Sequence, residues 1–417
     1  MIIQKIGLIG LGYVGLPLLH AFHAQYKMVG FDISVQRVDE LNHGVDVTGE
    51  LSSSEVRQCL ENGVTFTSDS GELKDCNVYI ITVPTPIDYK NQPDLSPLIN
   101  ASRTVGQFLE LGDLVIYEST VYPGVTEEIC VPELEKASSL KFNSDFYCGY
   151  SPERINPGDK EHKVTNILKV TSGSTPEIAQ IVDDLYSNVI AAGTHMCSSI
   201  KIAEASKVVE NTQRDMNIAL INELAIIFNH VGINTMEVIE AAATKWNFIK
   251  YSPGLVGGHC IGVDPYYLTY KAEQLGYTPN LILGARNVNN GMGRYVAQRT
   301  LKLMLQKDLP IKNSRILVLG FTFKENCSDI RNSKVVDIVN EMQEFGCEVD
   351  IFDDVACRLQ VKKEYGINLI ESFELDSYKG VIVAVAHDSF KSIQIPLSDE
   401  RVLFDVKSLY INHDGTL

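Results

Sequence analysis

The chain has 417 residues, of which 45% are hydrophobic and 21% charged, and its formal net charge at pH 7 is −17. One hydrophobic core rarely serves a chain of this length, so two or three domains are expected. The acidic balance argues against broad contact with nucleic acid or with an anionic membrane surface, because both require clustered lysine and arginine.

The nine cysteines are scattered and form no CxxC pair, which argues against a disulfide framework and predicts no metal site. At the N-terminus a strand-like run begins almost at once, without the basic region of a signal peptide. Apolar runs stay short of the roughly 18 residues that a membrane span needs. We therefore expect a cytoplasmic protein with no membrane segment.

Short apolar runs separated by helix-length segments fill the first part of the chain, as in parallel strands buried on both faces. They are residues 5–10, 27–32, 77–83 and 113–118, with further runs at 146–150 and 168–172. This alternation predicts a Rossmann-like domain over residues 1–195.

Residues 198–230 contain neither glycine nor proline, and apolar side chains recur near helical spacing from Ile202 to Leu224. The pattern predicts one long helix of about 45 Å, which is enough to connect two domains and to expose a surface for self-association. We assign residues 196–308 to a central helical domain that carries this surface and a catalytic loop.

Strand-like runs return after residue 310, in SRILVLGFTF, CEVDIFD, KGVIVAVAHD and RVLFDV. They predict a second Rossmann-like domain over residues 309–417. The expected fold class is therefore α/β, with two doubly wound domains joined by a long central helix and a helical segment.

A glycine pattern follows the first predicted strand. Gly10, Gly12 and Gly15 have the GxGxxG spacing, and Asp32 ends the next predicted strand about 20 residues later. A carboxylate there accepts hydrogen bonds from the ribose of NAD and repels a 2′-phosphate, so NAD is the expected cofactor. The runs TVPTP (82–86) and ESTVYPG (118–124) follow further strands and suit a cofactor rim, although each alone is more often an ordinary turn.

Two other patterns indicate candidate catalytic residues. Lys207 and Asn211 are four apart and share a helix face, where they would stabilise an oxyanion, although spacing alone favours a solvated polar face. The stretch GLVGGHCIGVDPYYL places Cys260 in a glycine-rich loop before Asp264, so the thiol is either a nucleophile or a buried small side chain. Asp264 before a proline also suits a helix start. A metal trio of His259, Cys260 and Asp264 is disfavoured, because no further histidine or cysteine lies at ligand spacing.

Seven ordered motifs resemble the UDP-sugar 6-dehydrogenase family, in the UDP-glucose/GDP-mannose dehydrogenase superfamily, over the whole length. They are GLGYVG with Asp32, VPTP, ESTVYPG, SPERINPGD, SKVVENT, GGHCIGVDPYYL and GFTFKENCSDIRNS. Members that act on UDP-glucose read GGSCFPKD around the thiol and NPEFL in the fourth motif. This chain is instead similar to the bacterial branch that acts on UDP-N-acetylhexosamines.

The resemblance implies catalytic roles for six residues. Cys260 would be the nucleophile, and Lys207 and Asn211 would stabilise the oxyanion and orient the substrate. Asp264 would act as a water-handling acid or base. Glu153 would assist thioester hydrolysis, and Thr120 would order a catalytic water.

The resemblance also implies two sets of binding residues. Those expected at NAD are Gly10, Gly12, Tyr13, Val14, Gly15, Asp32, Arg37, Pro84, Thr85, Ser119, Thr120 and Arg331. Those expected at the UDP-sugar are Glu153, Arg154, Lys207, Asn211, Tyr251, Gly257, Arg286, Phe323 and Lys324. Arg286 is a candidate for contact with the substrate of a partner subunit.

The implied activity is a two-step, NAD-dependent oxidation of the C6 alcohol of UDP-N-acetylglucosamine or UDP-N-acetylgalactosamine to the uronate. A homodimer or higher homo-oligomer would supply precursors of bacterial surface polysaccharides such as capsule or O-antigen. The alternatives are a UDP-glucose 6-dehydrogenase, a one-step β-hydroxyacid dehydrogenase and a silent nucleotide-binding regulator. The β-hydroxyacid alternative leaves Cys260 and the C-terminal domain unexplained, and the full set of functional side chains argues against a silent regulator.

Overall fold

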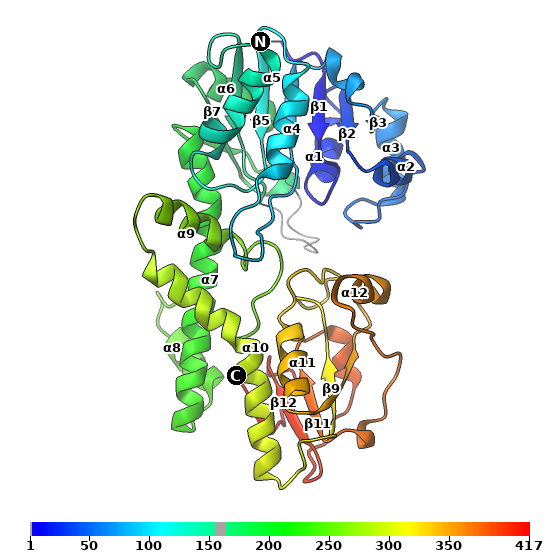
Figure 1. Cartoon of the computed structure of the whole chain (residues 1–417), viewed down its shortest axis with the longest axis vertical. Helices are drawn as coiled ribbons and strands as arrows, with labels where there is room; N and C mark the ends of the chain where they lie inside the picture. Colours follow the sequence, from blue (N-terminus) through cyan, green and yellow to red (C-terminus); the bar gives the residue numbers. More distant parts are fainter. Residues whose placement is uncertain (1, 155–163) are drawn as a thin grey trace. The chain divides into compact units, whose positions relative to one another are not determined.

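The computed structural model describes residues 2–154 and 164–417, and the chain divides into two compact α/β units (Figure 1). The first unit comprises Met1–Glu210 and Tyr266–Gly276, and the second comprises Asn211–Pro265 and Tyr277–Leu417. Of the fourth motif, Ile155 to Asp159 lie outside the described residues.

The first unit contains an eight-stranded sheet in the order β3-β2-β1-β4-β5-β6-β7-β8. Its strands are β1 (Ile6–Ile9), β2 (Met28–Phe31), β3 (Thr65–Thr67), β4 (Val78–Ile81), β5 (Asp113–Tyr117), β6 (Phe146–Tyr150), β7 (Lys169–Gly173) and β8 (Thr194–Met196). Strands β1 to β6 are parallel, and β7 runs antiparallel to β6. All six predicted strands are confirmed, whereas the short, partly exposed β3 and β8 were missed. The order reverses between β1 and β4, which is where open α/β sheets bind ligands.

Helices of the first unit bury apolar side chains against this sheet. They are α1 (Gly15–Phe22), α2 (Val35–Asn42), α3 (Ser53–Glu61), α4 (Ser96–Gly106), α5 (Val131–Ser138) and α6 (Pro176–Ser187), with short turns η1 (Ser70–Asp75), η2 (Thr126–Cys130) and η3 (Val164–Asn166). Leu16, Leu19 and Phe22 recur every three residues in α1 and pack in one core with Ile6 and Leu8 of β1. The N-terminus of α1 is thereby fixed directly after β1.

The predicted long helix is confirmed as α7 (Ile200–Val231), a single helix of 32 residues. Three of the apolar residues that predicted it, Ile202, Val209 and Leu220, are 51%, 52% and 55% exposed. Periodicity thus located the helix, but part of its apolar stripe faces solvent. The further helices of this region are α8 (Thr235–Ala243), α9 (Asp264–Gln274) and α10 (Asn280–Gln306).

The second unit contains a five-stranded parallel sheet in the order β10-β9-β11-β12-β13. Its strands are β9 (Arg315–Leu319), β10 (Glu348–Phe352), β11 (Gly380–Val383), β12 (Val402–Asp405) and β13 (Gly415–Thr416). Two helices, α11 (Val335–Glu344) and α12 (Arg358–Tyr365), and the turns η4 (Leu375–Ser377) and η5 (Asp388–Ser392) complete the unit. One core lies on each face of the sheet, and α10 and α11 contribute to the larger.

These two doubly wound units and the long helix confirm the predicted fold class. The order of the second sheet reverses between β9 and β11, which marks its own expected ligand position. Within the described residues, no helix combines the length and hydropathy needed to cross a membrane.

Candidate active site

The glycine fingerprint forms the turn from β1 into α1. A Cβ atom on Gly15 would lie 1.8 Å from the carbonyl oxygen of Gly10, so a larger residue cannot occupy this position. At Gly12 a Cβ atom would meet no atom within 4 Å, which leaves the backbone open to an approaching pyrophosphate. Asp32 accepts a hydrogen bond from the Leu11 N–H at 2.8 Å, which brings its carboxylate beside this turn. This arrangement fits a dinucleotide.

Arg37 lies beneath the same turn. Its Nε donates to the Leu11 carbonyl at 2.8 Å, and its guanidinium pairs with Asp46 at 2.8 Å. Only 8% of Arg37 is exposed. Arg37 therefore supports the fingerprint loop. Direct contact between Arg37 and the cofactor stays a prediction.

The two loops predicted as a cofactor rim lie side by side. Thr85 donates from its hydroxyl to the carbonyl of Thr120 at 2.7 Å, and Ser119 donates to the carbonyl of Val83 at 2.6 Å. The Tyr267 hydroxyl donates to the Thr85 carbonyl at 2.6 Å. These bonds fix the segments that carry three of the predicted cofactor residues. Of the others, Pro84 is exposed, and Tyr13 and Val14 are half-buried.

A buried ion pair lies under this rim and was missed by sequence reasoning. The Lys169 ammonium pairs with the Glu118 carboxylate, which also accepts a hydrogen bond from Tyr186. Burial raises the pKa of Glu118, and the charge of Lys169 opposes that rise. The sequence does contain a sign of this pair. Two strand-like apolar runs, VIYEST and LKVTS, each include one charged residue, and charged residues are rarely buried without a partner.

Lys207 and Glu153 meet in the first unit, as expected of residues that share a site. The Lys207 ammonium lies 3.7 Å from the Glu153 carboxylate, and these residues are only 4% and 9% exposed. Spacing alone favoured a solvated face for Lys207, and its burial shows that interpretation to be wrong. Burial and the negative charges of Asp46 and Glu153 raise the pKa of the nearby Glu50 to about 7. Sequence reasoning missed Glu50.

Cys260, Asp264 and Asn211 form a second group, in the second unit. Asp264 begins α9, as predicted, and its N–H donates to the Cys260 carbonyl at 2.8 Å. Asn211 donates from Nδ2 to the Asp264 carboxylate at 2.6 Å, and both side chains are buried. Of the nine cysteines, all are buried except the partly exposed Cys260 and the exposed Cys357. The thiol of the glycine-rich loop is thus reachable, as a nucleophile requires.

Glycine shapes the loop before Cys260. Gly258 has a φ of +79°, and a Cβ atom there would lie 2.8 Å from the Phe323 ring. Its N–H donates to the Arg331 carbonyl at 3.0 Å, and its carbonyl accepts from Asn332 at 3.1 Å. These contacts hold the catalytic loop against the segment that follows β9. The GGHC and GFTFKENCSDIRNS motifs are therefore in direct contact.

A pocket of about 240 Å³ opens beside this loop. Gly257, Phe323 and Lys324, all predicted to contact the UDP-sugar, line it together. Lys334 and Lys407 also line it, so three lysines gather in a protein whose net charge is −17. The pocket includes residues that follow β9 and β11, at the strand-order reversal of the second sheet. A diphosphate suits such a basic pocket, and sequence reasoning missed Lys334 and Lys407.

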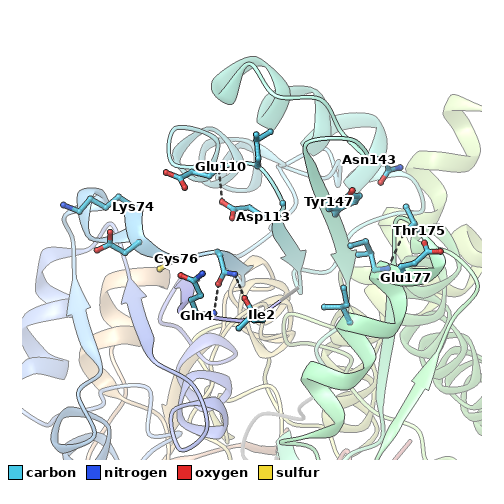
Figure 2. A pocket seen from close by; sticks show the side chains of 16 residues that line it. Ile2, Gln4, Lys74, Cys76, Glu110, Asp113, Asn143, Tyr147, Thr175 and Glu177 are labelled. Atoms are coloured by element: carbon cyan, nitrogen blue, oxygen red, sulfur yellow. Dashed lines mark hydrogen bonds between the residues drawn. The ribbon is translucent and has the colours of Figure 1, made fainter.

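A larger hollow of about 980 Å³ lies at the opposite edge of the first sheet (Figure 2). Gln4 and Asn77 lie before β1 and β4, and Asp113 begins β5. These are the amino ends of the strands, away from the carboxyl ends where such sheets bind ligands. We assign no part of the active site to it.

Arg286 forms a buried ion pair within its own chain. Its guanidinium lies 2.6 Å from the Asp215 carboxylate, and only 2% of Arg286 is exposed. Asn289 joins Asp215 to Asn222, which exchanges hydrogen bonds with the backbone of Gly254 at 2.8 and 3.0 Å. This network supports the start of the Cys260 loop, and contact of Arg286 with a substrate stays a prediction.

The other predicted binding residues occupy varied surroundings. Arg154 pairs with Glu210 at 2.7 Å in the first unit. Arg331 pairs with Asp329 at 2.5 Å in the second unit, and Tyr251 is half-buried. Their ligand contacts stay predictions.

The second unit has its own counterpart of Asp32. Asp353 follows β10 and accepts hydrogen bonds from the N–H groups of Phe321 and Thr322 at 2.6 and 3.2 Å. Unlike Asp32, it is fully buried and also pairs with His387 at 3.1 Å. Burial opposes ionisation, but these hydrogen bonds prevail and lower the pKa of Asp353 to about 2. Asp32 is only partly buried and makes no such bond to a histidine among the described residues, so of the two units the first retains an accessible carboxylate at this position.

Comparison with known proteins agrees with this geometry. The UDP-glucose/GDP-mannose dehydrogenase family matches in three parts: its NAD binding domain over residues 4–190, its central domain over 201–291 and its UDP binding domain over 317–412. A UDP-N-acetyl-D-glucosamine 6-dehydrogenase of Pseudomonas aeruginosa is 56% identical over 410 residues, which is 97% of each chain. One of Salmonella typhi is 54% identical over 97% of this chain and 96% of its own.

Among solved structures, the UDP-D-ManNAc dehydrogenase of Pyrococcus horikoshii matches with a TM-score of 0.89 at 29% identity, over 99% of this chain and 98% of that one. These findings confirm the resemblance predicted from the seven motifs. They also confirm NAD as the cofactor of the first domain. The chain belongs to the UDP-glucose/GDP-mannose dehydrogenase family.

Proposed function

We propose that the protein is an NAD-dependent UDP-N-acetyl-D-glucosamine 6-dehydrogenase that oxidises the C6 alcohol to a carboxylate through a thioester on Cys260. The observation that carries the proposal is the partly exposed Cys260 beside the buried Asp264 and Asn211 pair. Full-length identities of 56% and 54% to enzymes of that name support the choice of sugar. The lysine-lined pocket beside Gly257 supports binding of the substrate through a nucleotide diphosphate.

The fingerprint loop, Asp32 and the tied rim of Thr85 and Ser119 would hold the cofactor. NAD, when bound, supplies the hydride acceptor for both oxidations. Asp32 would accept hydrogen bonds from the ribose and disfavour a 2′-phosphate.

The thiol is needed because the reaction removes two hydrides from one carbon. Loss of a proton and a hydride from the alcohol gives an aldehyde, whose carbon is planar. Addition of the Cys260 sulfur makes this carbon tetrahedral as a thiohemiacetal, and loss of a second hydride and proton gives a thioester. Water then displaces the sulfur, which regains its proton and releases the uronate.

The buried polar residues would stabilise negative charge and transfer protons in these steps. Lys207 and Asn211, one turn apart on α7, would stabilise the successive oxyanions, since a cation and an amide donor are strongest where water is excluded. Asp264 and Glu153 would move protons and orient the hydrolytic water, which Thr120 also helps to order. The pairing of Glu153 with Lys207 supports a role for this carboxylate at the reacting carbon.

Substrate choice is tested by NADH formation with a panel of UDP-sugars. UDP-N-acetylglucosamine is expected to give a higher kcat/KM than UDP-N-acetylgalactosamine and UDP-glucose, with two NADH formed per uronate. A preference for UDP-glucose contradicts the assigned sugar. A yield of one NADH per sugar contradicts the two-step mechanism and favours a simple alcohol dehydrogenase.

Cofactor binding is tested by Asp32→Ala. The variant is expected to bind NAD about 1 to 3 kcal/mol more weakly, because hydrogen bonds to a charged acceptor are lost. It is also expected to lose discrimination against NADP, as measured by kcat/KM with each cofactor. The control is Asp39→Ala, which removes an exposed carboxylate from α2 and should match the parent protein. Equal use of NAD and NADP by the parent protein would contradict the role of Asp32.

We also propose that the protein acts as a homodimer. The apolar residues Ile202, Val209 and Leu220, half-exposed on α7, support an interface along this helix.

A further inference from the structure

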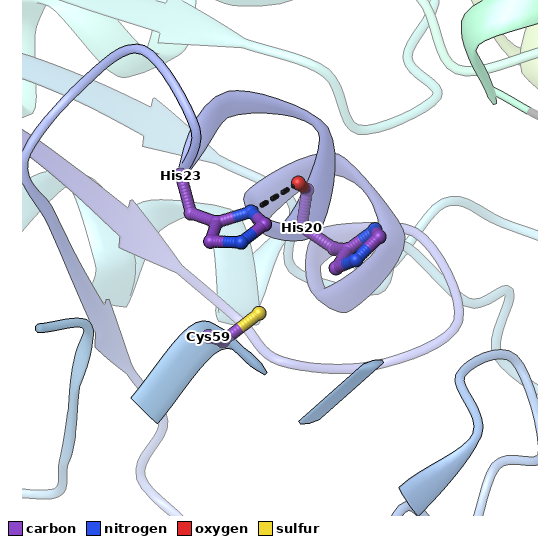
Figure 3. A group of neighbouring side chains, drawn as sticks. All are labelled: His20, His23 and Cys59. Atoms are coloured by element: carbon purple, nitrogen blue, oxygen red, sulfur yellow. Dashed lines mark hydrogen bonds between the residues drawn. The ribbon is translucent and has the colours of Figure 1, made fainter. Parts of the chain in front are cut away.

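Three side chains of the types that bind transition metals meet in the first unit, outside the active site (Figure 3). His20 lies in the last turn of α1, His23 directly follows α1, and Cys59 lies in α3. One ligand atom from each residue lies within 4.8 Å of the other two. Figure 3 shows the Cys59 sulfur directed toward the side where both imidazole rings lie.

The hydrogen bonding of His23 leaves one ring nitrogen ready for a metal. Its Nδ1 lies 2.5 Å from the His20 carbonyl oxygen, and a carbonyl only accepts, so Nδ1 carries the proton. Nε2 therefore presents a lone pair. His23 is 8% exposed, and Nε2 is buried without a hydrogen-bond partner among the described residues. Buried acceptors are normally paired, and a bound cation would use this lone pair.

The surroundings of Cys59 also favour a cation. Cys59 is fully buried in α3. Glu55 lies one turn earlier in this helix and brings a negative charge to the same face. His20 is only partly buried, which gives an ion a route from solvent.

We propose that His20, His23 and Cys59 bind Zn²⁺, with water as the fourth ligand. Two imidazoles and one thiolate suit the tetrahedral N and S coordination of zinc. On binding, the ion takes the place of the Cys59 thiol proton, which passes to solvent, and no electron is transferred. The ion would join α1 to α3 about 12 Å from the fingerprint end of α1, since an eight-residue helix has that length. It would therefore stabilise the NAD-binding domain without entering the reaction.

Cobalt replaces zinc as a spectroscopic probe in the test. The full-length protein, freed of metal by a chelator, is titrated with Co²⁺ and the thiolate-to-cobalt charge-transfer absorption is followed. One saturable band per chain is expected, and Zn²⁺ should abolish it. Cys59→Ala should lose the band. Cys76→Ala should keep it, because Cys76 is a similarly buried thiol of the same unit that does not belong to the cluster.

The histidines give an independent test. His20→Gln, at a partly exposed position that tolerates the change, is expected to weaken Co²⁺ binding about 10-fold or more. The exposed His43→Gln is the matched control and should bind Co²⁺ like the parent protein. Zn²⁺ should raise the Tm of the parent but not of His20→Gln. The proposal is overturned if the parent shows no thiolate band, or if both Cys59→Ala and His20→Gln leave the band unchanged.

Discussion

Replacement of Cys260 by alanine is expected to abolish uronate formation while NAD binding and the fold are retained. The loss follows because the thioester cannot form without the sulfur. The fold should survive because Cys260 is partly exposed on a loop, so removing its sulfur opens little cavity. Uronate production is measured by chromatography, NAD binding by calorimetry and the fold by Tm.

The Cys260→Ser variant tests the covalent intermediate directly. A serine hydroxyl is a weak nucleophile at neutral pH, and an ester that it forms hydrolyses more slowly than a thioester. This variant is expected to make little uronate and to accumulate a covalent sugar adduct, detected by intact-protein mass spectrometry. The control is Cys357→Ala, which removes the exposed thiol of the second unit and should leave activity unchanged. Near-normal uronate production by Cys260→Ala would show that this thiol only packs.

Lys207→Met is expected to lower kcat about 100-fold to 1,000-fold, as when a single oxyanion-stabilising donor is removed from an enzyme. Lys207 is 4% exposed, so its charge acts where little water screens it. Methionine keeps most of the apolar stem and isolates the loss of the ammonium group. The measurement is kcat with UDP-N-acetylglucosamine, with the Tm recorded in parallel.

Two further variants separate chemistry from folding. Lys207→Met leaves the Glu153 carboxylate buried without its cation, so some loss of stability is expected. Adding Glu153→Gln removes that charge and should recover the Tm but not kcat. Lys201→Met lies on the same helix, but Lys201 is half-exposed and pairs with Glu128 at 3.2 Å, so its kcat should be unchanged. A kcat for Lys207→Met within a few fold of the parent value would exclude a catalytic role.

The matched family domains fall in different units of the chain. The first contains the NAD-binding domain, and the second contains the UDP-binding domain and the cysteine loop. Each unit has a carboxylate after its second strand, Asp32 in the first and Asp353 in the second, and His387 contacts Asp353. The two α/β units thus differ in the surroundings of this carboxylate and in the lysine-lined pocket of the second unit.

The sequence by itself determined the features that depend on local geometry. Strands buried on both faces require apolar runs, which located six strands of the first sheet, and the absence of glycine and proline located α7. The spacing of Gly10, Gly12 and Gly15 predicted the fingerprint turn, because its steric limits act between residues a few positions apart. Seven such local motifs were enough to predict the family.

Only the tertiary structure decided which distant side chains meet and which face solvent. Glu153 and Lys207 pair across 54 positions of sequence, Asn211 and Asp264 across 53, and periodicity carries no information about either distance. The bond from Arg37 to the fingerprint loop was not predicted either, and contact of Arg37 with the cofactor stays a prediction. Lys407 in the basic pocket and the His20, His23 and Cys59 cluster were likewise invisible to motif spacing. The physical reason is that hydrophobic periodicity fixes each element and its buried face, whereas contacts between elements depend on how all of them pack together.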